Sequence, residues 1–486
     1  MAAHIISLPH DIIILLMQHL SVEDLAALCC TCKVIHGMVE EFGWNGYLRT
    51  NPRPSYSLSN CITSWSAGAQ ARYNTIADRN WARLRFIARP LSQRWVGRLQ
   101  PRLAINSSKF LIGSGNTIYS YGFGTSSTGT SPPVLFEGIY ATSAVHPEHD
   151  ISALVCVPDG GADRTIFVGY VNGGMERISL PNTGHSAQHL SASHRVHYDF
   201  HGGCSVEALS TSSSHLLSLS SDGTAALLSL DPDSPRLETI DLGTRSWSCH
   251  LRMDASTPYA VFGTTSLDPL CVHPVCESSF SAQPLVSLSS PTTSERPTAV
   301  YALSSAPPAC AWGASDQIVV SGWFDGNVHV FDLRSPVRSA TQSSRPSILP
   351  VMSFCDPWSP EAIYSLSCGG GSASHITAGS ARHSVLAFWD VRSPYKGWSV
   401  HAPGNDSSPV YSVVMDGSRV FGANESRGFV YDFGPGVTEE TYPPVDIENV
   451  PHSRTSGRWR KTMLDNGKGP KVDGPGFYVT MYKHNK

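Results

Sequence analysis

The sequence predicts a mainly β protein preceded by a small helical region, and three observations support this fold class. Residues 318–336 resemble a β-hairpin, because two β-rich apolar runs flank a turn at Asp325 and Gly326. Residues 376–394 and 420–432 repeat this pattern. Only 15% of the residues are charged, while glycine and proline are abundant, which suits many short strands and turns.

The composition limits the classes of protein and partner. The chain has 486 residues, of which 41% are hydrophobic, so it can form two or three domains with a sizeable core. Its net charge of -4 gives no general reason to expect nucleic acid or a membrane as a partner. No run approaches the ~18 apolar residues of a membrane span, and no basic region precedes the first apolar run, so we expect no secretory signal.

The twelve cysteines show paired spacing only at Cys29, Cys30 and Cys32. No second Cys/His pair at zinc-finger spacing accompanies this cluster, so we expect no metal site there. Reduced thiols are typical of proteins in reducing compartments. We therefore expect a cytoplasmic and/or nuclear protein.

Residues 5–48 have a helical pattern, unlike the rest of the chain. Pro9 suits the first position of one helix. Ser21 followed by Asp24 predicts a capping box for a second helix, and Thr31 is expected to cap a third.

The first of these helices is apolar on every side over residues 12–17. A unit of about forty residues has too small an interior to bury such a helix completely. The pattern therefore predicts a surface that a partner covers. The alternative is a core helix packed on the β domain that follows.

Residues 1–48 resemble an F-box. The matching residues are Leu8, Pro9, Asp11, Ile12, Ile13, Leu20, Asp24, Leu25, Leu28, Cys32, Lys33 and Trp44, whereas His36 and Gly37 stand where bulkier apolar residues are commoner. F-boxes dock on a Skp-type adaptor of cullin-RING ubiquitin ligases, so the resemblance implies that this region binds such an adaptor. The residues that match the adaptor-binding positions are Leu8, Pro9, Ile13, Leu16, Leu20, Leu25 and Leu28.

Residues 49–95 are predicted as a helical, Arg-rich linker, with a helix over residues 64–92 that Pro90 stops. Eight arginines and the single acid Asp78 lie between residues 64 and 102. Such a patch can bind nucleic acid or an acidic partner. We favour arginine stems that cover apolar surface, because nothing here resembles a nucleic-acid-reading module.

The repeated hairpins resemble the WD-repeat family. In that family an aromatic-Asp pair, such as Phe331 with Asp332, closes the third strand of a four-stranded propeller blade. The candidate third strands are residues 117–121, 175–180, 224–230, 270–275, 327–333, 385–391 and 428–433. An open stack would expose sheet edges, so the seven units predict one closed seven-bladed WD-type β-propeller over residues 96–449.

The segments around these repeats carry further expectations. Residues 442–447 are expected to supply the outer strand of the last blade, and eight blades are the alternative if residues 477–482 build another sheet. Residues 450–486 are predicted as a basic C-terminal tail. The long loops are expected at residues 124–133, 182–203, 287–296 and 339–347.

The sequence gives no catalytic set, so we expect neither an enzyme nor a bound cofactor or metal. His194, His197 and His201 have the spacing nearest to a metal cluster, but they fall in a predicted surface loop. The glycines at 369–371 are not followed by the Lys-Ser/Thr of a phosphate loop. No Gly-x-Ser-x-Gly elbow frames a nucleophile.

The two resemblances together imply the substrate-recognition subunit of a Skp-cullin-F-box E3 ubiquitin ligase, which is not itself catalytic. Its partners would be the adaptor, the cullin and a target protein held on the propeller. A scaffold without a ligase role is one alternative, and a nucleic-acid-associated adaptor is another. A third is a receptor of a different cullin ligase, whose propeller-type adaptor would face Arg334 and Arg392 in their Asp-x-Arg boxes.

The target is expected at the end of the propeller where the turns between second and third strands meet the loops that enter each first strand. Aromatic residues beside arginine are typical of binding hot spots, and arginine can hold an acidic or phosphorylated segment. The residues expected there are Trp323, Phe324, Arg382, His383, Arg427, Arg195 and Tyr198. The alternative is that Trp323 packs between blades and that the arginines are solvated.

Overall fold

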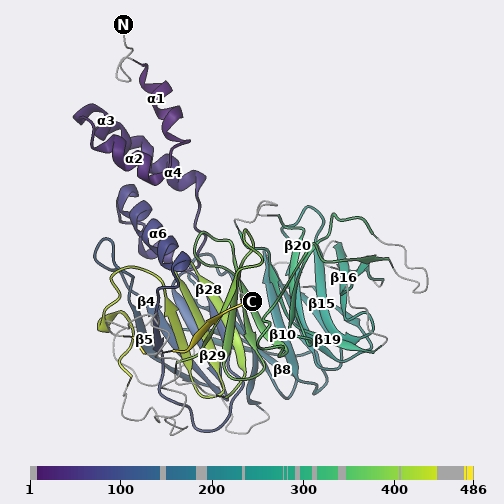
Figure 1. The fold of residues 1–486 in the computed structure, drawn as a ribbon. Helices are drawn as coiled ribbons and strands as arrows, with labels where there is room; N and C mark the ends of the chain where they lie inside the picture. The colour runs from purple at the N-terminus through teal and green to yellow at the C-terminus, as the bar shows by residue number, and fades with distance from the viewer. Residues whose placement is uncertain are drawn as a thin grey trace.

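The computed structural model describes residues 8–142, 149–181, 194–231, 236–276, 279–281, 283–290, 296–308, 315–337, 346–403, 407–445, 476–477 and 479–484. Over these residues the protein is mainly β, and its helices project from one side of a body of sheets (Figure 1). Most of the predicted basic tail and parts of three predicted loops lie outside the described residues. No described helix is both long and apolar enough to cross a membrane.

The N-terminal helices confirm the helical pattern. They are α1 (His10–Met17), α2 (Val22–Cys29), α3 (Lys33–Met38), the π-helical turn η2 (Val39–Gly43) and α4 (Trp44–Thr50). The predicted capping box is present, because the Asp24 amide donates to Ser21 Oγ at 3.1 Å and the Ser21 amide donates to Asp24 Oδ2 at 3.3 Å. The cap expected at Thr31 is wrong, since its hydroxyl donates to the Leu28 carbonyl of the preceding helix.

These helices share one small core. Its buried members are Ile13, Met17, Leu25, Ile35, Met38, Val39, Trp44 and Ala71. Ala71 belongs to α6 (Ala67–Ala82), the longest of the described helices, which follows the short α5 (Leu58–Cys61). The first four helices therefore pack on the linker helix as one unit (Figure 1).

The linker ends differently from the prediction. A helix to residue 92 is wrong, because α6 ends at Ala82 and Leu84 takes a positive φ of 54°. The chain then forms strand β1 (Ile87–Pro90), which pairs with β30 (Gly428–Asp432). β1 thus takes the outer place that was predicted for residues 442–447, of which residues 446–447 lie outside the described residues. Pro90 is compatible with this place because β1 lies at a sheet edge.

The body consists of antiparallel sheets whose strands follow one another along the chain. The first sheet contains β2 (Arg102–Ile105), β3 (Lys109–Ser114), β4 (Thr117–Phe123) and β5 (Val134–Ala141). The second contains β6 (Ile151–Cys156), β7 (Thr165–Tyr170), β8 (Gly174–Ser179) and β9 (His194–Asp199). The third contains β10 (Val206–Ser212), β11 (His215–Ser220), β12 (Thr224–Ser229) and β13 (Leu237–Asp241).

A ten-stranded sheet follows, and it joins two sets of four. The sets are β14 (Ser246–Arg252), β15 (Tyr259–Ser266), β16 (Leu270–Cys276) and β18 (Val286–Leu288), then β19 (Thr298–Ser305), β20 (Ile318–Trp323), β21 (Asn327–Asp332) and β23 (Met352–Cys355). They meet where β15 pairs with β19. The short strands β17 (Ser279–Phe280) and β22 (Ser347–Ile348) pair with β16 and β18.

The last two sheets draw on the ends of the chain. One contains β24 (Ile363–Gly369), β25 (His375–Ser380), β26 (Val385–Asp390), β27 (Gly397–His401) and β31 (Met481–Lys483). The other contains β28 (Val410–Asp416), β29 (Arg419–Asn424), β30 and β1. Because β31 adds a fifth strand to an existing sheet, the alternative of a further sheet at residues 477–482 is wrong.

Each of the seven predicted third strands coincides with an observed strand, namely β4, β8, β12, β16, β21, β26 or β30. The first strands contact one another in turn: β2 contacts β6, β6 contacts β10, and the series continues through β14, β19, β24 and β28. β28 in turn contacts β2. The contacts between these described strands therefore run in a cycle.

Trp81 fixes the linker helix to the body. Its ring stacks on Phe433 at a centroid distance of 3.7 Å and tilts against His375 at 4.7 Å. The glycines at 369–371 make room for it, since a Cβ at Gly370 would lie 2.8 Å from the Trp81 ring. Gly370 also has a φ of 61°, which favours glycine. These glycines thus have a packing role.

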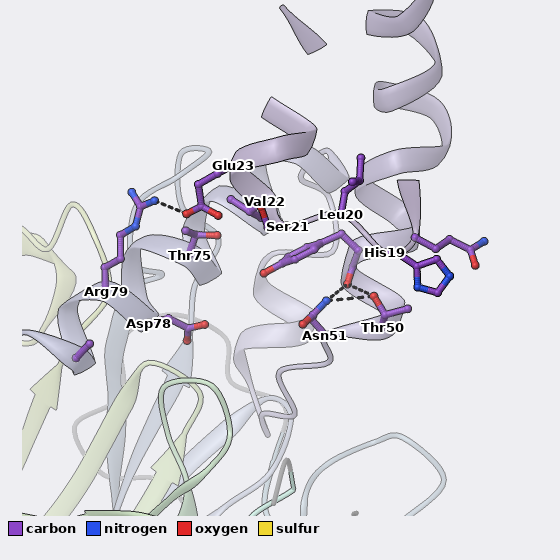
Figure 2. A pocket seen from close by; sticks show the side chains of 13 residues that line it. His19, Leu20, Ser21, Val22, Glu23, Thr50, Asn51, Thr75, Asp78 and Arg79 are labelled. Carbon is purple, nitrogen blue, oxygen red and sulfur yellow. Dashed lines mark hydrogen bonds and ion pairs between the residues drawn. The ribbon is translucent and has the colours of Figure 1, made fainter. Parts of the chain in front are cut away.

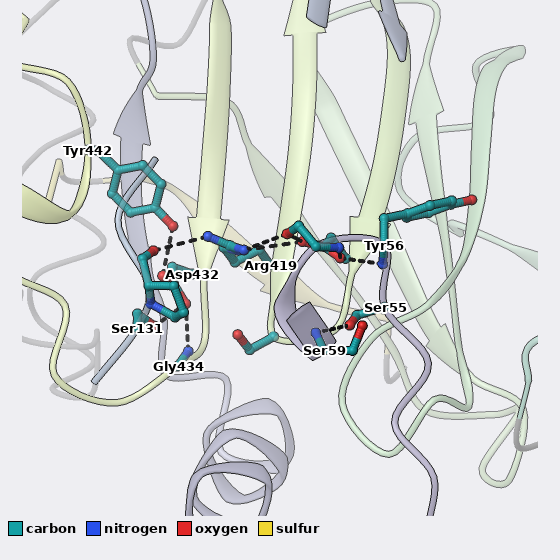
Figure 3. A network of polar contacts seen from close by, with 12 residues as sticks. Ser55, Tyr56, Ser59, Ser131, Arg419, Asp432, Gly434 and Tyr442 are labelled. Atoms are coloured by element: carbon teal, nitrogen blue, oxygen red, sulfur yellow. Dashed lines mark hydrogen bonds and ion pairs between the residues drawn. The ribbon is translucent and has the colours of Figure 1, made fainter. Parts of the chain in front are cut away.

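A buried polar network makes a second connection between linker and body (Figure 3). Asp416 accepts hydrogen bonds from the amides of Tyr56 and Ser57 at 2.7 and 3.1 Å. Arg419, which is fully buried, lies 3.2 Å from Asp416 and donates to the Ser57 hydroxyl at 2.9 Å. Removing one partner of such a buried pair leaves an uncompensated charge, so the network holds the linker in one position.

The same network continues toward the neighbouring strand end (Figure 3). Tyr442 and Ser131 both donate to the carboxylate of Asp432, at 2.7 and 3.2 Å. The hydroxyl of Tyr73, on α6, lies 3.2 Å from that of Ser131. The helices are therefore anchored through both polar and aromatic contacts.

Candidate functional site

An apolar surface on α1 is the first candidate site. Ile12, Leu15 and Leu16 are exposed on this helix, and Leu8 is exposed just before it. The helix is thus apolar on more sides than its own unit covers, as the sequence predicted. We call these four residues the α1 surface.

The structure divides the predicted adaptor-binding residues into three groups. Leu8, Pro9 and Leu16 are exposed, whereas Leu20 and Leu28 are half-buried against the helical core. Ile13 and Leu25 are buried inside that core, so they support the helices and do not reach the surface. Sequence reasoning left out Ile12 and Leu15, although their place in the all-apolar run was a signal for them.

An open groove lies beside these helices (Figure 2). Its lining residues include His19, Leu20, Ser21, Val22, Glu23, Thr50, Asn51, Thr75, Asp78 and Arg79. Arg79 on α6 pairs with Glu23 on α2 at 2.7 Å. Both side chains are exposed, so this pair contributes little stability. The lining exposes polar and apolar surface to a similar extent, which makes the groove a less apolar docking surface than the α1 surface.

The turns at one end of the sheets hold the second candidate site. Phe324 and Arg382 are exposed there, and the nearest acid to Arg382 is Glu361, at 3.7 Å. Trp323 and Arg427 are buried, so the prediction that they form an exposed face is wrong. The Trp323 ring packs in the hydrophobic core of the sheets. Its buried Nε1 donates to the Ser321 hydroxyl at 2.8 Å.

His383 is exposed beside Arg382, but Arg195 and Tyr198 lie elsewhere. Both belong to the outer strand β9, so the prediction of a loop at these positions is wrong. Arg195 donates to the Ala141 carbonyl at 2.9 Å. Tyr198 packs its ring 5.7 Å from that of Phe167. The predicted target-binding residues therefore do not form one group.

Four aromatic residues occupy equivalent places in four successive first strands. The register of β14, β19, β24 and β28 shifts at Trp247, Tyr301, Tyr364 and Tyr411, which marks a β-bulge at each. All four side chains are half-buried. Their ring centroids are separated in order by 5.0, 5.3 and 6.1 Å. We call these four residues the aromatic arc.

The aromatic arc lies at the end where the turns between second and third strands gather. Phe324, in the turn between β20 and β21, has its ring 6.3 Å from Tyr301. The equivalent bulges in β6 and β10 carry Ser152 and Glu207. The bulge position is therefore aromatic in β14, β19, β24 and β28 and polar in β6 and β10.

Charged groups flank both ends of the arc. The Arg245 guanidinium lies 4.2 Å above the Trp247 ring and pairs with Glu207 at 2.8 Å. Burial, followed by the carboxylate of Glu425, raises the pKa of Tyr411 to about 12. Its hydroxyl therefore stays protonated and can donate a hydrogen bond. Half-buried aromatic residues with arginine at the rim are the composition of protein-binding hot spots.

Sequence reasoning missed the arc because it identified the third strands and not the first ones. Trp247, Tyr364 and Tyr411 are each the second residue of their strands, whereas Tyr301 is the fourth residue of β19. The interval between each arc residue and the start of the next strand differs from repeat to repeat, so a fixed spacing in the sequence does not reveal the four residues.

A Ser-His-Asp cluster elsewhere has a structural role. Ser399 Oγ lies 2.6 Å from Asp356 Oδ2 and 2.8 Å from His484 Nε2. Ser399 is fully buried, so no substrate can reach its hydroxyl. The cluster instead binds the segment of β31 to β27, and Tyr482 donates to the same carboxylate at 2.7 Å.

In the turns, Asp222 and Asp325 accept hydrogen bonds from the backbone amides two residues further on, as local turn chemistry predicts.

A scan of the chain against protein-family models gives no match, and a comparison with curated proteins gives none either.

Proposed function

We propose that this protein is the substrate-recognition subunit of a Skp-cullin-F-box E3 ubiquitin ligase. Residues 1–48 act as the F-box that docks a Skp-type adaptor and its cullin. The sheets form a seven-bladed WD-type propeller that holds the target protein. The protein positions its target and is not itself catalytic, and it acts in the cytoplasm and/or the nucleus.

The observation that carries this proposal is the α1 surface on a helical unit that is fixed to a larger body. Leu15 and Leu16 expose apolar side chains on α1, outside the core of the helical unit. Exposed apolar side chains gathered on one element are typical of a protein-binding site. The sequence around them resembles an F-box, and F-boxes bind a Skp-type adaptor, so we infer that the adaptor is the partner.

The propeller interpretation rests on the order of the strands. Seven sets of antiparallel strands follow one another along the described chain. Contacts between successive first strands run from β2 to β28 and return to β2, which supports closure of the ring. β1 comes from before the first set and pairs with β30 of the last, so the two ends of the domain share one sheet. Such pairing protects the edges that an open stack would expose.

The rigid linker explains how the two sites work together. Trp81 and Tyr73 hold α6 against the body, and the pair Asp416 and Arg419 holds the linker at Tyr56 and Ser57. The distance between the α1 surface and the aromatic arc is therefore fixed. A fixed distance keeps a bound target at high effective concentration near the ubiquitin-carrying enzyme. The aromatic arc, with Phe324 and Arg382 at its rim, is the target-binding face.

The alternative through Asp-x-Arg boxes has less support. Arg334 donates from Nε and from a terminal nitrogen to the two carboxylate oxygens of Asp332, both at 2.8 Å. Arg392 makes the same two-point contact with Asp390. These local ion pairs account for both arginines without a second adaptor. An Arg334→Ala and Arg392→Ala double variant should therefore keep its cullin.

Affinity purification with quantitative mass spectrometry tests the proposal in two directions. Leu16→Glu should lose the adaptor and the cullin but keep the target, because a charge in an apolar interface costs several kcal/mol. Tyr301→Ala with Tyr364→Ala should lose the target but keep the adaptor and the cullin. Leu237→Glu, at a leucine of similar exposure on the outer strand β13, is the matched control.

Each outcome of this purification decides one part of the proposal. A Leu16→Glu protein that retained the adaptor and the cullin like wild type would remove the F-box assignment. A scaffold without a ligase role would show neither partner in the wild-type sample. Unchanged target capture by the Tyr301 and Tyr364 variant would move the target away from the aromatic arc.

A further inference from the structure

Three metal-ligating side chains meet at one edge of the helical unit. The Sγ atom of Cys29 lies 3.0 Å from Nδ1 of His36 and 3.8 Å from Oε1 of Glu40. The three ligand atoms all lie within 4.8 Å of one another. Among the described residues, these three side chains form a group of His, Cys, Asp or Glu that is compact enough to hold one metal ion.

The secondary structure brings these residues together from three elements. Cys29 is the last residue of α2, and His36 lies on α3. Glu40 follows four residues after His36, in the π-helical turn η2, so both side chains project from one helical face. Single π-helical turns within α-helices are frequent at functional sites.

Glu40 is held in place by a neighbour outside the group. The indole Nε1 of Trp44 donates to Glu40 Oε1 at 3.0 Å. Trp44 itself belongs to the core of the helical unit. Hydrogen bonds of this kind orient the ligands of metal sites and raise their affinity. Cys29 and His36 are partly or fully exposed, so an ion can reach them from solvent.

The spacing of the three ligands suits a tetrahedral ion. Zn–S bonds of about 2.3 Å and Zn–N or Zn–O bonds of about 2.0–2.1 Å place sulfur about 3.5 Å from the other ligand atoms. The observed 3.0 and 3.8 Å lie on either side of this value, so small side-chain rotations are enough. The soft thiolate with imidazole favours zinc-class ions over magnesium or calcium.

We propose that Cys29, His36 and Glu40 bind one zinc-class divalent ion, with a water molecule in the fourth position. The ion links α2, α3 and η2, and it stabilises the helical unit by mass action. This site does not depend on the ligase role, because it needs only the fold of residues 22–44.

Cobalt(II) titration of the reduced full-length protein tests the site directly. Wild type should bind one equivalent with the visible bands of a tetrahedral ion and a thiolate-to-cobalt charge-transfer band, and zinc should displace the cobalt. Cys29→Ser should lose the charge-transfer band, and His36→Ala or Glu40→Gln should weaken binding at least tenfold. Cys30→Ser, next to the site, and Cys276→Ser, exposed on β16, are the matched controls and should bind like wild type.

A second readout separates metal binding from misfolding. Zinc should raise the melting temperature of wild type and of Cys276→Ser but not of Cys29→Ser, while the circular dichroism spectra without metal should be the same. Cobalt spectra in wild type that are octahedral, or that show no bound ion, would overturn the proposal. The three side chains would then be a hydrogen-bonded group without a metal. A charge-transfer band that persisted in Cys29→Ser would overturn it as well. Loss of adaptor binding with intact cobalt spectra would affect only the ligase role.

Discussion

Replacing Trp81 with alanine tests the anchor between helices and body. The side chain is 2% exposed and stacks on Phe433. Truncating a buried Trp costs about 3–5 kcal/mol. We expect the upper part of this range, because the Trp81 ring rests on the backbone of Gly370 and Gly371 and few side chains can move into the space. The loss of the ring should also let α6 move relative to the sheets.

Two measurements on Trp81→Ala address stability and position separately. Guanidinium denaturation gives the change in the free energy of unfolding. Distances between spin labels on α2 and on β13 should be narrowly distributed in wild type and broader in the variant. Trp358→Ala is the control, because Trp358 is 60% exposed and should cost about 1 kcal/mol or less. A loss below 1 kcal/mol with unchanged distances would refute the anchoring role of Trp81.

Two further predictions concern pH and the C-terminal strand. Burial lowers the pKa of His329 to about 4, below its unfolded value near 6.5. The neutral ring therefore contributes up to about 3 kcal/mol to the free energy of unfolding, a contribution that is complete above pH 6.5 and is lost as the pH falls toward 4. Denaturation curves of wild type and His329→Gln should converge over this interval, and parallel curves would contradict the assignment. Burial would raise the pKa of Asp356, but hydrogen bonds from His484, Ser399 and Tyr482 hold it at about 2. Asp356→Asn should therefore speed hydrogen exchange in β31 and leave exchange in β20 unchanged, and equal protection of β31 in both proteins would count against this role.

The parts of the fold that local chemistry determines could be predicted from the sequence. The capping box of Ser21 with Asp24 uses residues three apart, and the third strands carry their own turns, such as Asp325 with Gly326. Both predictions are confirmed. The strand at residues 87–90 was not predicted, because its pairing partner β30 lies more than three hundred residues away.

The candidate sites were less accessible to sequence reasoning. A buried and an exposed aromatic residue look alike in a turn, so Trp323 was predicted on the surface although its neighbour Phe324 is the exposed one. The spacing of His36 and Glu40 is visible in the sequence, but the approach of Cys29 depends on how α2 packs on α3. The packing of separate elements is what local patterns do not contain.

The central claim is tested most directly by titrating a purified Skp-type adaptor into the purified full-length protein by calorimetry. Leu16 is 48% exposed, and its matched control Leu237 is 46% exposed. A glutamate at Leu16 would lie uncompensated in the interface at a cost of several kcal/mol, and each 1.4 kcal/mol is about tenfold in Kd. We expect wild type and Leu237→Glu to bind one adaptor with equal affinity and Leu16→Glu to bind at least a hundredfold more weakly. Equal binding by all three proteins, or no binding by wild type, would contradict the account.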